Sequence, residues 1–159
     1  IMNHRKSIAV DFDGTLFGDN SWSGYIKNTK SCILNGPYFN PNELDIRWAI
    51  LTGRSKKDVP LIWMICNSNG LSPRKIYTQD TIRNNIFSTK EQIDFKVHKL
   101  KSLLNGETET NFIIGKVSKI FYMDSDLDVV KGINEFTSGS SITAVSLLDF
   151  KKNQYNIIF

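Results

Sequence analysis

Apolar residues gather in short runs along the chain, and longer segments with helical spacing of apolar positions separate these runs. Three runs, at residues 7–11, 46–51 and 119–123, are typical of buried strands. Two weaker strand candidates lie at residues 74–78 and 141–148. The pattern therefore predicts a sheet of short strands drawn from the whole length of the chain.

Helices are predicted between these strands, at residues 56–68, 89–105 and 127–136. The second helix has the clearest signals, because Thr89 and Gln92 have the spacing of a capping box and an apolar stripe follows at helical intervals. Strands that alternate with helices along a chain form parallel sheets with helices on both faces. We therefore expect an α/β fold, a three-layer doubly wound parallel sheet.

The length of 159 residues fits a single domain, residues 1–159, that buries a core without disulfides. The segment 17–45 is polar and rich in aromatics, and we interpret it as a small insert that is too short for a second domain. A second loop-like insert is expected at 106–118. No apolar run approaches the length of a membrane span.

Charge and cysteine content bear on the cellular compartment of the protein and on its partners. Cys32 and Cys66 lack metal or redox spacing, so we expect reduced thiols and a cytoplasmic protein. The net charge of +4 comes from scattered basic clusters, which mildly favour a phosphorylated or polyanionic partner. A solvated basic surface explains the same charge equally well. The sequence indicates no membrane partner and no particular oligomeric state.

Polar side chains follow three of the predicted strands. Asp11 and Asp13 end the first strand, residues 52–54 (Thr-Gly-Arg) follow the second, and Asp124 begins an acidic loop after the strand at 119–123. The carboxyl ends of parallel strands share one edge of the sheet, so these groups should converge in one crevice. Carboxylates held this close repel each other, and Mg²⁺ is the cation that suits their hard oxygens.

The order of these motifs resembles the haloacid dehalogenase-like (HAD) phosphatases. The matching elements are Asp-Phe-Asp-Gly-Thr at 11–15, Thr-Gly-Arg at 52–54, a lysine on the helix 89–105, and Asp-Ser-Asp-Leu-Asp at 124–128. The resemblance extends from residue 8 to about residue 130. It implies a Rossmann-like fold of the minimal type, without a large cap domain, and hydrolysis of a phosphate ester.

The resemblance also implies roles for the residues that would carry out catalysis. Asp11 would be the nucleophile that forms an aspartyl-phosphate. Asp13 would protonate the leaving group and then deprotonate the hydrolytic water. Thr52 and the amide of Gly53 would bind a phosphoryl oxygen. A lysine must offset the negative charge that the phosphate brings to these acids.

A magnesium site is implied in the same way. Its ligands would be the carboxylates of Asp11 and Asp124 and the carbonyl of Asp13. Asp128 would support the site by orienting the lysine or a metal-bound water. Met123 stands where the family often has glycine, a departure that affects the local turn and not the acids.

Two lysines on the helix 89–105 compete for the role at the site. Lys96 lies at the edge of the apolar stripe, where it faces the sheet, while Lys99 lies further round the helix. The dipeptide Phe95-Lys96 is also similar to an element of small phosphatase domains in nucleic-acid repair proteins. We therefore expect Lys96 at the site and keep Lys99 as the alternative.

Each motif has a simpler structural interpretation when taken alone. Residues 13–15 are a common turn, 124–128 resembles an acidic helix start, and a single lysine such as Lys96 usually extends along the surface to solvent. Arg54 could bind a phosphate or form a salt bridge with a helix end. The joint occurrence of the motifs in this order is what favours a functional site.

Two classes of function follow. The favoured one is a Mg²⁺-dependent phosphatase, because the segment between Thr15 and Ile50 leaves no room for a large cap. An open site suits an exposed phosphate on a nucleotide or polynucleotide, with a phosphoprotein substrate or phosphotransferase activity as alternatives. The other class is a non-catalytic binding module. Aromatic residues of the insert either stack on a base or pack it onto the sheet: Trp22, Tyr25, Tyr38 and Phe39.

Overall fold

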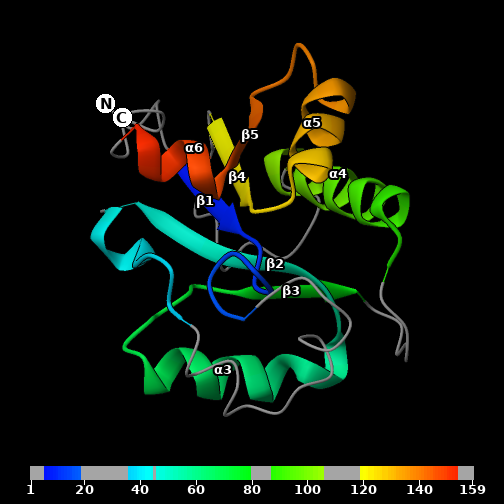
Figure 1. Cartoon of the computed structure of the whole chain (residues 1–159). Helices are drawn as coiled ribbons and strands as arrows, with labels where there is room; N and C mark the ends of the chain where they lie inside the picture. The colour runs from blue at the N-terminus through cyan, green and yellow to red at the C-terminus, as the bar shows by residue number, and fades with distance from the viewer. Residues whose placement is uncertain (1–5, 19–35, 45, 80–86, 106–118, 154–159) are drawn as a thin grey trace.

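The computed structural model describes residues 6–18, 36–44, 46–79, 87–105 and 119–153. Five parallel strands form one sheet in the order β3-β2-β1-β4-β5 (Figure 1). The strands are β1 (Lys6–Val10), β2 (Arg47–Ser55), β3 (Ile76–Gln79), β4 (Lys119–Asp124) and β5 (Ile142–Ser146). The helices are α3 (Val59–Ser68), α4 (Thr89–Asn105), α5 (Leu127–Phe136) and α6 (Leu147–Lys152), with 3-10 turns η1 (Pro41–Leu44) and η2 (Lys56–Asp58). The predicted α/β class is confirmed.

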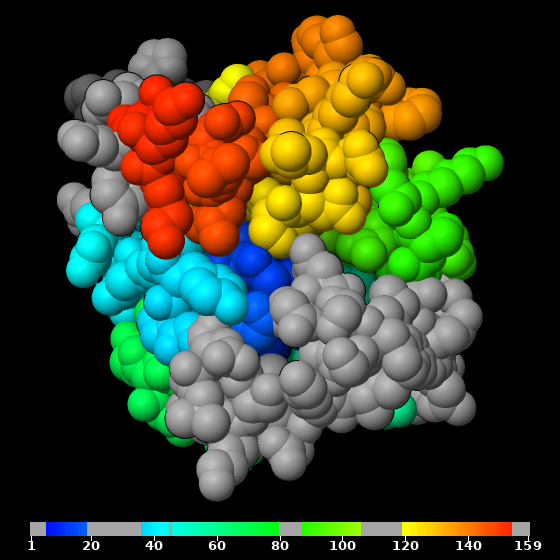
Figure 2. Space-filling view, in the orientation of Figure 1, coloured from blue at the N-terminus to red at the C-terminus, as the bar shows by residue number. Residues whose placement is uncertain are grey.

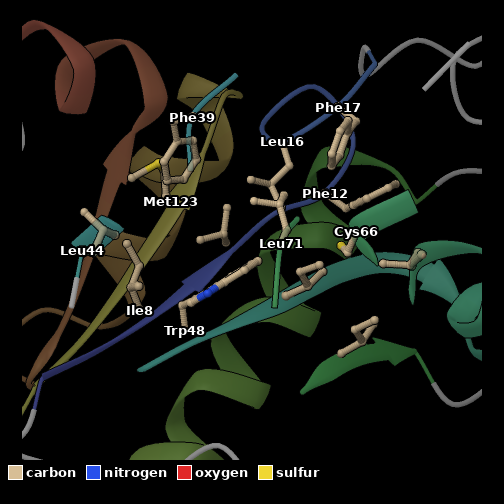
Figure 3. Packing of buried hydrophobic residues seen from close by; sticks show 14 of the residues in the cluster. Ile8, Phe12, Leu16, Phe17, Phe39, Leu44, Trp48, Cys66, Leu71 and Met123 are labelled. Atoms are coloured by element: carbon tan, nitrogen blue, oxygen red, sulfur yellow. The ribbon is translucent and has the colours of Figure 1, made fainter. Parts of the chain in front are cut away.

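The sheet separates two apolar cores, because alternate residues of each strand point to opposite faces. On β1, Ile8 and Val10 belong to the core beneath α3 and α6, whereas Ala9 belongs to the core beneath α4 and α5. Figure 3 shows the first of these cores, in which Trp48 and Met123 are among the packed side chains. Helices on both faces make the three layers that the sequence predicts.

Helix α5 packs closely against α4 through a glycine. Gly132 is buried on α5, and a Cβ atom at this position would overlap the side chain of Ile93 on α4, with Cγ1 at 2.9 Å. A larger residue would therefore force the two helices apart. This contact places α4 at a fixed distance from the helix that follows β4.

The predicted elements agree with the structure except at their ends. Helices α4 and α5 have the expected bounds, while β2 continues to Ser55 and α6 replaces the end of the strand expected at 141–148. Ser146 ends β5 and caps α6, since its hydroxyl accepts a bond from the amide of Asp149. The capping box of α4 was placed one residue late: Ser88 and Glu91, rather than Thr89 and Gln92, exchange the two bonds.

The described part of the expected insert packs against the core. Phe39 is buried there, and the hydroxyl of Tyr38 donates to the carbonyl of Gly18, so these two aromatics serve packing. The remaining expectations for the insert, including Trp22, Tyr25 and Cys32, lie outside the described residues, as does the loop expected at 106–118. Cys66 is a buried free thiol, and burial raises its pKa to about 12. None of the described helices combines the length and apolar character needed to cross a membrane.

The strand order creates a switch point beside β1. The chain moves from β1 to β2 and β3 on one side of the sheet and then returns to β4 and β5 on the other. Ligand sites of open α/β sheets form outside the carboxyl ends of strands at such a point. Residues that follow β1 and β4 therefore meet in this crevice.

The start of α5 offers a test of the local structure. The carboxylate of Asp126 caps the helix by accepting bonds from the amides of Asp128 and Val129, so Asp126→Ala should lower the free energy of unfolding by about 1 kcal/mol. Asp128→Ala is the matched control, because its exposed side chain lies in the first turn without capping it. Urea denaturation measures both, and equal losses in the two variants would contradict the capping role.

Candidate active site

Asp11 lies at the carboxyl end of β1, in the crevice beside β4. Its amide donates to the carbonyl of Met123 (2.9 Å), which extends the pairing of β1 with β4 by one residue. Gly14 then adopts a positive φ of 77°, and the chain turns back so that several amides bond to the carbonyl of Phe12. In Figure 2 this loop, in blue, reaches the surface between the start of α5 and residues 36–44. The turn thus leaves Asp11 at the base of an accessible loop.

Thr15 connects this loop to the one after β4. Its buried hydroxyl donates to Oδ2 of Asp11 (3.3 Å) and accepts from the amide of Ser125 (3.0 Å). The residues around Asp11 and Asp124 are therefore held by one shared side chain. Such a link keeps two carboxylates near each other in spite of their repulsion.

Lys96 is the group that compensates the charge of both acids. Its side chain is fully buried, and Nζ lies 3.3 Å from Oδ1 of Asp11 and 2.9 Å from Oδ2 of Asp124. A third contact runs to Oε1 of Gln92 (3.1 Å), one turn earlier on α4. The structure thus brings Lys96 into the crevice, whereas Lys99 lies over the ring of Tyr77.

Tyr122 supports Asp124 from within the sheet, a role that the sequence analysis missed. Its buried hydroxyl donates to Oδ2 of Asp124 (2.6 Å), while the amide of Asp126 donates to Oδ1 (3.0 Å). The signal was a tyrosine in an otherwise apolar strand, two residues before the acid and so on the same face. Gln92 was also missed as a site residue. Its signal was its position one helical turn before Lys96 on the same helix.

Asp13 faces a different partner from Asp11. Both of its oxygens accept bonds from Arg54, with Nε and Nη2 each at 2.8 Å. Arg54 is only 2% exposed and also lies 3.6 Å from Asp58 at the start of α3. Of the two interpretations of Arg54, the described contacts show the salt bridge, with the acid of the first motif as the main partner.

Thr52 and Gly53 lie near the end of β2, where the chain approaches the crevice. Thr52 is buried, and its hydroxyl accepts from the amide of Arg54 (3.2 Å). The ring of Phe87 packs on Gly53, with its Cδ2 atom 3.0 Å from the point that a Cβ would occupy. The sequence analysis did not identify Phe87, because no motif surrounds it.

Electrostatics set the acids of this site apart from ordinary surface carboxylates. Burial, reinforced by the charge of Asp124, raises the pKa of Asp11 well above its usual value. Burial also raises the pKa of Asp13, although Arg54 opposes the shift. Burial by itself would lower the pKa of Lys96, but Asp11 and Asp124 outweigh it and raise this pKa. The crevice therefore favours an added cation or a proton.

The predicted magnesium ligands fit a hard divalent cation by their chemistry. When both acids are ionised, Asp11 and Asp124 bring two negative charges to the single ammonium of Lys96, and the group then has an excess of one negative charge that a cation or a proton can offset. Among the described residues, no three acidic, histidine or cysteine side chains converge as a ready-made cation site. The expected set has only two carboxylates near each other, because Asp13 would contribute its carbonyl. Asp128 is exposed in the first turn of α5, and the described contacts of Lys96 do not include it.

Comparison with known proteins supports the fold. The chain is similar to a chain in the structure of the Pnkp1/Rnl/Hen1 RNA repair complex, with a TM-score of 0.57 and 17% identity. The match covers 90% of this chain, which spans only 43% of the length of that one. Likeness at this level of identity establishes the fold alone.

A second similar structure is the HAD domain of the effector protein Lem4 from Legionella pneumophila. It has a TM-score of 0.48 and 11% identity, and the match covers 95% of this chain and 94% of that domain. No family model and no curated protein sequence matches the chain.

The buried acid should make stability depend on pH. Above its ordinary pKa of 3.8, Asp11 ionises in the unfolded chain while the folded protein still holds the proton, so the free energy of unfolding falls as pH rises through this interval. Asp11→Asn removes this contribution, so the free energy of unfolding of the variant should fall less steeply than that of the wild type as pH rises above 3.8. Urea denaturation in chelator at several pH values measures the difference. Plots of the free energy of unfolding against pH that stay parallel for the two proteins would contradict this prediction.

The ion pair of Arg54 and Asp13 should be costly to break from one side. Arg54→Met leaves Asp13 buried without its partner and should lower the free energy of unfolding by about 3–5 kcal/mol. Asp13→Asn in the same chain removes the unpaired charge and should restore much of the loss. Urea denaturation of the single and double variants gives the coupling free energy between Arg54 and Asp13. Additive effects would show that the two side chains do not stabilise each other.

Proposed function

We propose that this chain is a magnesium-dependent phosphomonoesterase of the HAD type that works through an aspartyl-phosphate on Asp11. The observation that carries the proposal is the position of Asp11 at the switch point, with Lys96 and Thr15 on its two oxygens. A carboxylate with this support is a nucleophile that cannot turn away from the crevice. The hydroxyl of Thr52 and the amide of Gly53, near the end of β2, would donate to a phosphoryl oxygen.

The proposed reaction consists of two displacements at phosphorus. An oxygen of Asp11 attacks phosphorus, the ester bond breaks, and the leaving oxygen takes a proton from Asp13. Asp13 then removes a proton from water as the water oxygen attacks phosphorus, which releases inorganic phosphate and restores Asp11. Lys96 balances the negative charge that the phosphoryl group adds to the crevice.

A bound magnesium ion, held by Asp11, Asp124 and the carbonyl of Asp13, would lower the negative charge of the phosphoryl group and hold it in line. Asp124 keeps its orientation through Tyr122 and the amide of Asp126, independently of any ion. Arg54 must loosen its hold on Asp13 for proton transfer, since both oxygens of this acid are engaged. Burial raises the pKa of Asp13 and the pair with Arg54 opposes that rise, so loosening the pair would also favour the protonated acid.

The substrate we propose is an exposed phosphate on a nucleotide or polynucleotide. The positive net charge supports a polyanion, and the fold shared with a chain of an RNA repair complex makes nucleic-acid ends the first substrates to test. A phosphoprotein phosphatase or a phosphotransferase on the same scaffold is the alternative. A binding module without turnover is favoured by one observation, the engagement of both Asp13 oxygens by Arg54.

Turnover of a chromogenic aryl phosphate tests the proposal. The wild type should release phosphate with Mg²⁺ and stop with chelator, and Asp11→Asn should reduce the rate to background because the nucleophile is lost. Lys96→Met should lower kcat by about 10²–10³-fold. Lys99→Met is the matched control on the same helix and should retain the wild-type rate, since Lys99 lies over Tyr77. A wild-type rate no higher than background would exclude the enzyme and favour the binding module, and equal rates above background in the wild type and Asp11→Asn would refute Asp11 as the nucleophile.

A further inference from the structure

An aromatic side chain borders the end of β2, where we expect Thr52 and Gly53 to bind the phosphoryl group. Phe87 packs on Gly53 through the Cδ2 side of its ring, with Cδ2 and Cε2 at 3.0 and 3.7 Å from the Cβ position. Gly53 lies directly after Thr52 in β2, so the ring borders the strand segment that carries the expected phosphate-binding residues.

The position of this ring is well determined by its neighbours. Phe87 directly precedes the capping box of Ser88 and Glu91, whose two bonds (3.0 and 3.2 Å) fix where the chain enters α4. The ring of Phe95, one turn into α4, supports it with the ring centroids 5.8 Å apart and the planes inclined by 40°. Both rings remain partly exposed. They form an aromatic pair beside Lys96, which follows Phe95 in the chain.

Positive charge lies along the same edge of the sheet. Lys56 and Lys57 are exposed in η2, directly after β2 ends, and Lys90 is exposed at the start of α4. A partly exposed aromatic ring near basic side chains is the combination by which proteins bind single-stranded nucleic acids, since bases stack on the ring and phosphates meet the cations. A phosphoserine or phosphothreonine places no ring next to its phosphate. These features favour a nucleotide over a phosphoserine or phosphothreonine peptide.

We infer that Phe87 is the stacking surface for the base of the terminal nucleotide of a single-stranded nucleic acid, whose terminal phosphate reaches Asp11. This assignment rests on the proposed phosphatase function and specifies its substrate. Phe87 would thus determine specificity, and Phe95 would hold its ring in place. Lys56 and Lys57 would meet the next phosphates of the strand.

The experiment compares two short oligonucleotides that differ only in the base of the phosphorylated terminal residue, which is either present or replaced by an abasic sugar. Each is prepared with a 3′- and with a 5′-phosphate, and a phosphoserine peptide is the non-nucleotide substrate. The quantity measured is the ratio of kcat/KM with the base to kcat/KM without it. In the wild type, the ratio should be roughly 5- to 150-fold for at least one of the two ends.

Variants separate stacking from packing. Phe87→Ala should bring the ratio close to one, and Phe87→Trp should keep it high. If the ring served only to pack on Gly53, Phe87→Ala would instead change kcat/KM for both oligonucleotides equally and leave their ratio unchanged. Phe136→Ala is the matched control. Phe136 is 62% exposed at the carboxyl end of α5, so its loss should change kcat/KM for neither oligonucleotide. A wild-type ratio of one at both ends, or faster turnover of the phosphopeptide, would overturn the assignment.

A binding measurement distinguishes failure of this assignment from failure of the phosphatase proposal. The fluorescence of 2-aminopurine at the phosphorylated end should be quenched on binding to Asp11→Asn, and Phe87→Ala in the same chain should abolish the quenching. Quenching without turnover in the wild type would refute the phosphatase and retain the stacking site. Turnover without quenching would refute the stacking site and retain the phosphatase.

Discussion

The whole crevice depends on one buried ammonium group shared by two carboxylates. Lys96 contacts Asp11 from β1 and Asp124 from β4, so three elements that are distant in sequence are joined by one positive charge. Two buried acids beside adjacent strands would otherwise repel each other strongly, in an environment where water cannot screen them. The sheet supplies the closeness of the two strands, and α4 supplies the charge that makes this closeness tolerable. The packing of α4 on the sheet and the charge balance of the crevice therefore depend on the same ion pairs.

A second charge pair lies beside the first and is kept distinct from it. Asp13 is two residues from Asp11, yet its hydrogen-bond partner is Arg54 and not Lys96, because β1 ends at Val10 and the chain bends at Phe12, between the two acids. The rigid fork of a guanidinium fits both oxygens of one carboxylate, while an ammonium can lie between two separate acids. The chemical difference between arginine and lysine therefore assigns different environments to two acids of one motif.

Much of this arrangement could be predicted from the sequence, because it follows from local pattern and from topology. The apolar runs located β1 and β4, and the common direction of parallel strands brought Asp11 and Asp124 together. The stripe of α4 distinguished Lys96 from Lys99. The contacts of Tyr122 and Phe87 could not be predicted, since each depends on how a side chain meets a residue far away in the chain. The cap at Ser88 was missed because neighbouring residues offered two equally good capping boxes.

The glycine between α4 and α5 has a consequence for the charge in the crevice. Gly132 lets Ile93 approach α5, and Lys96 lies on the next turn of the same helix. The separation of the two helices consequently sets how far the ammonium reaches toward both acids. A larger residue at position 132 would therefore also displace the helix that carries Lys96. The packing of α4 against α5 on this face of the sheet thus helps to set the position of the ammonium between the two acids.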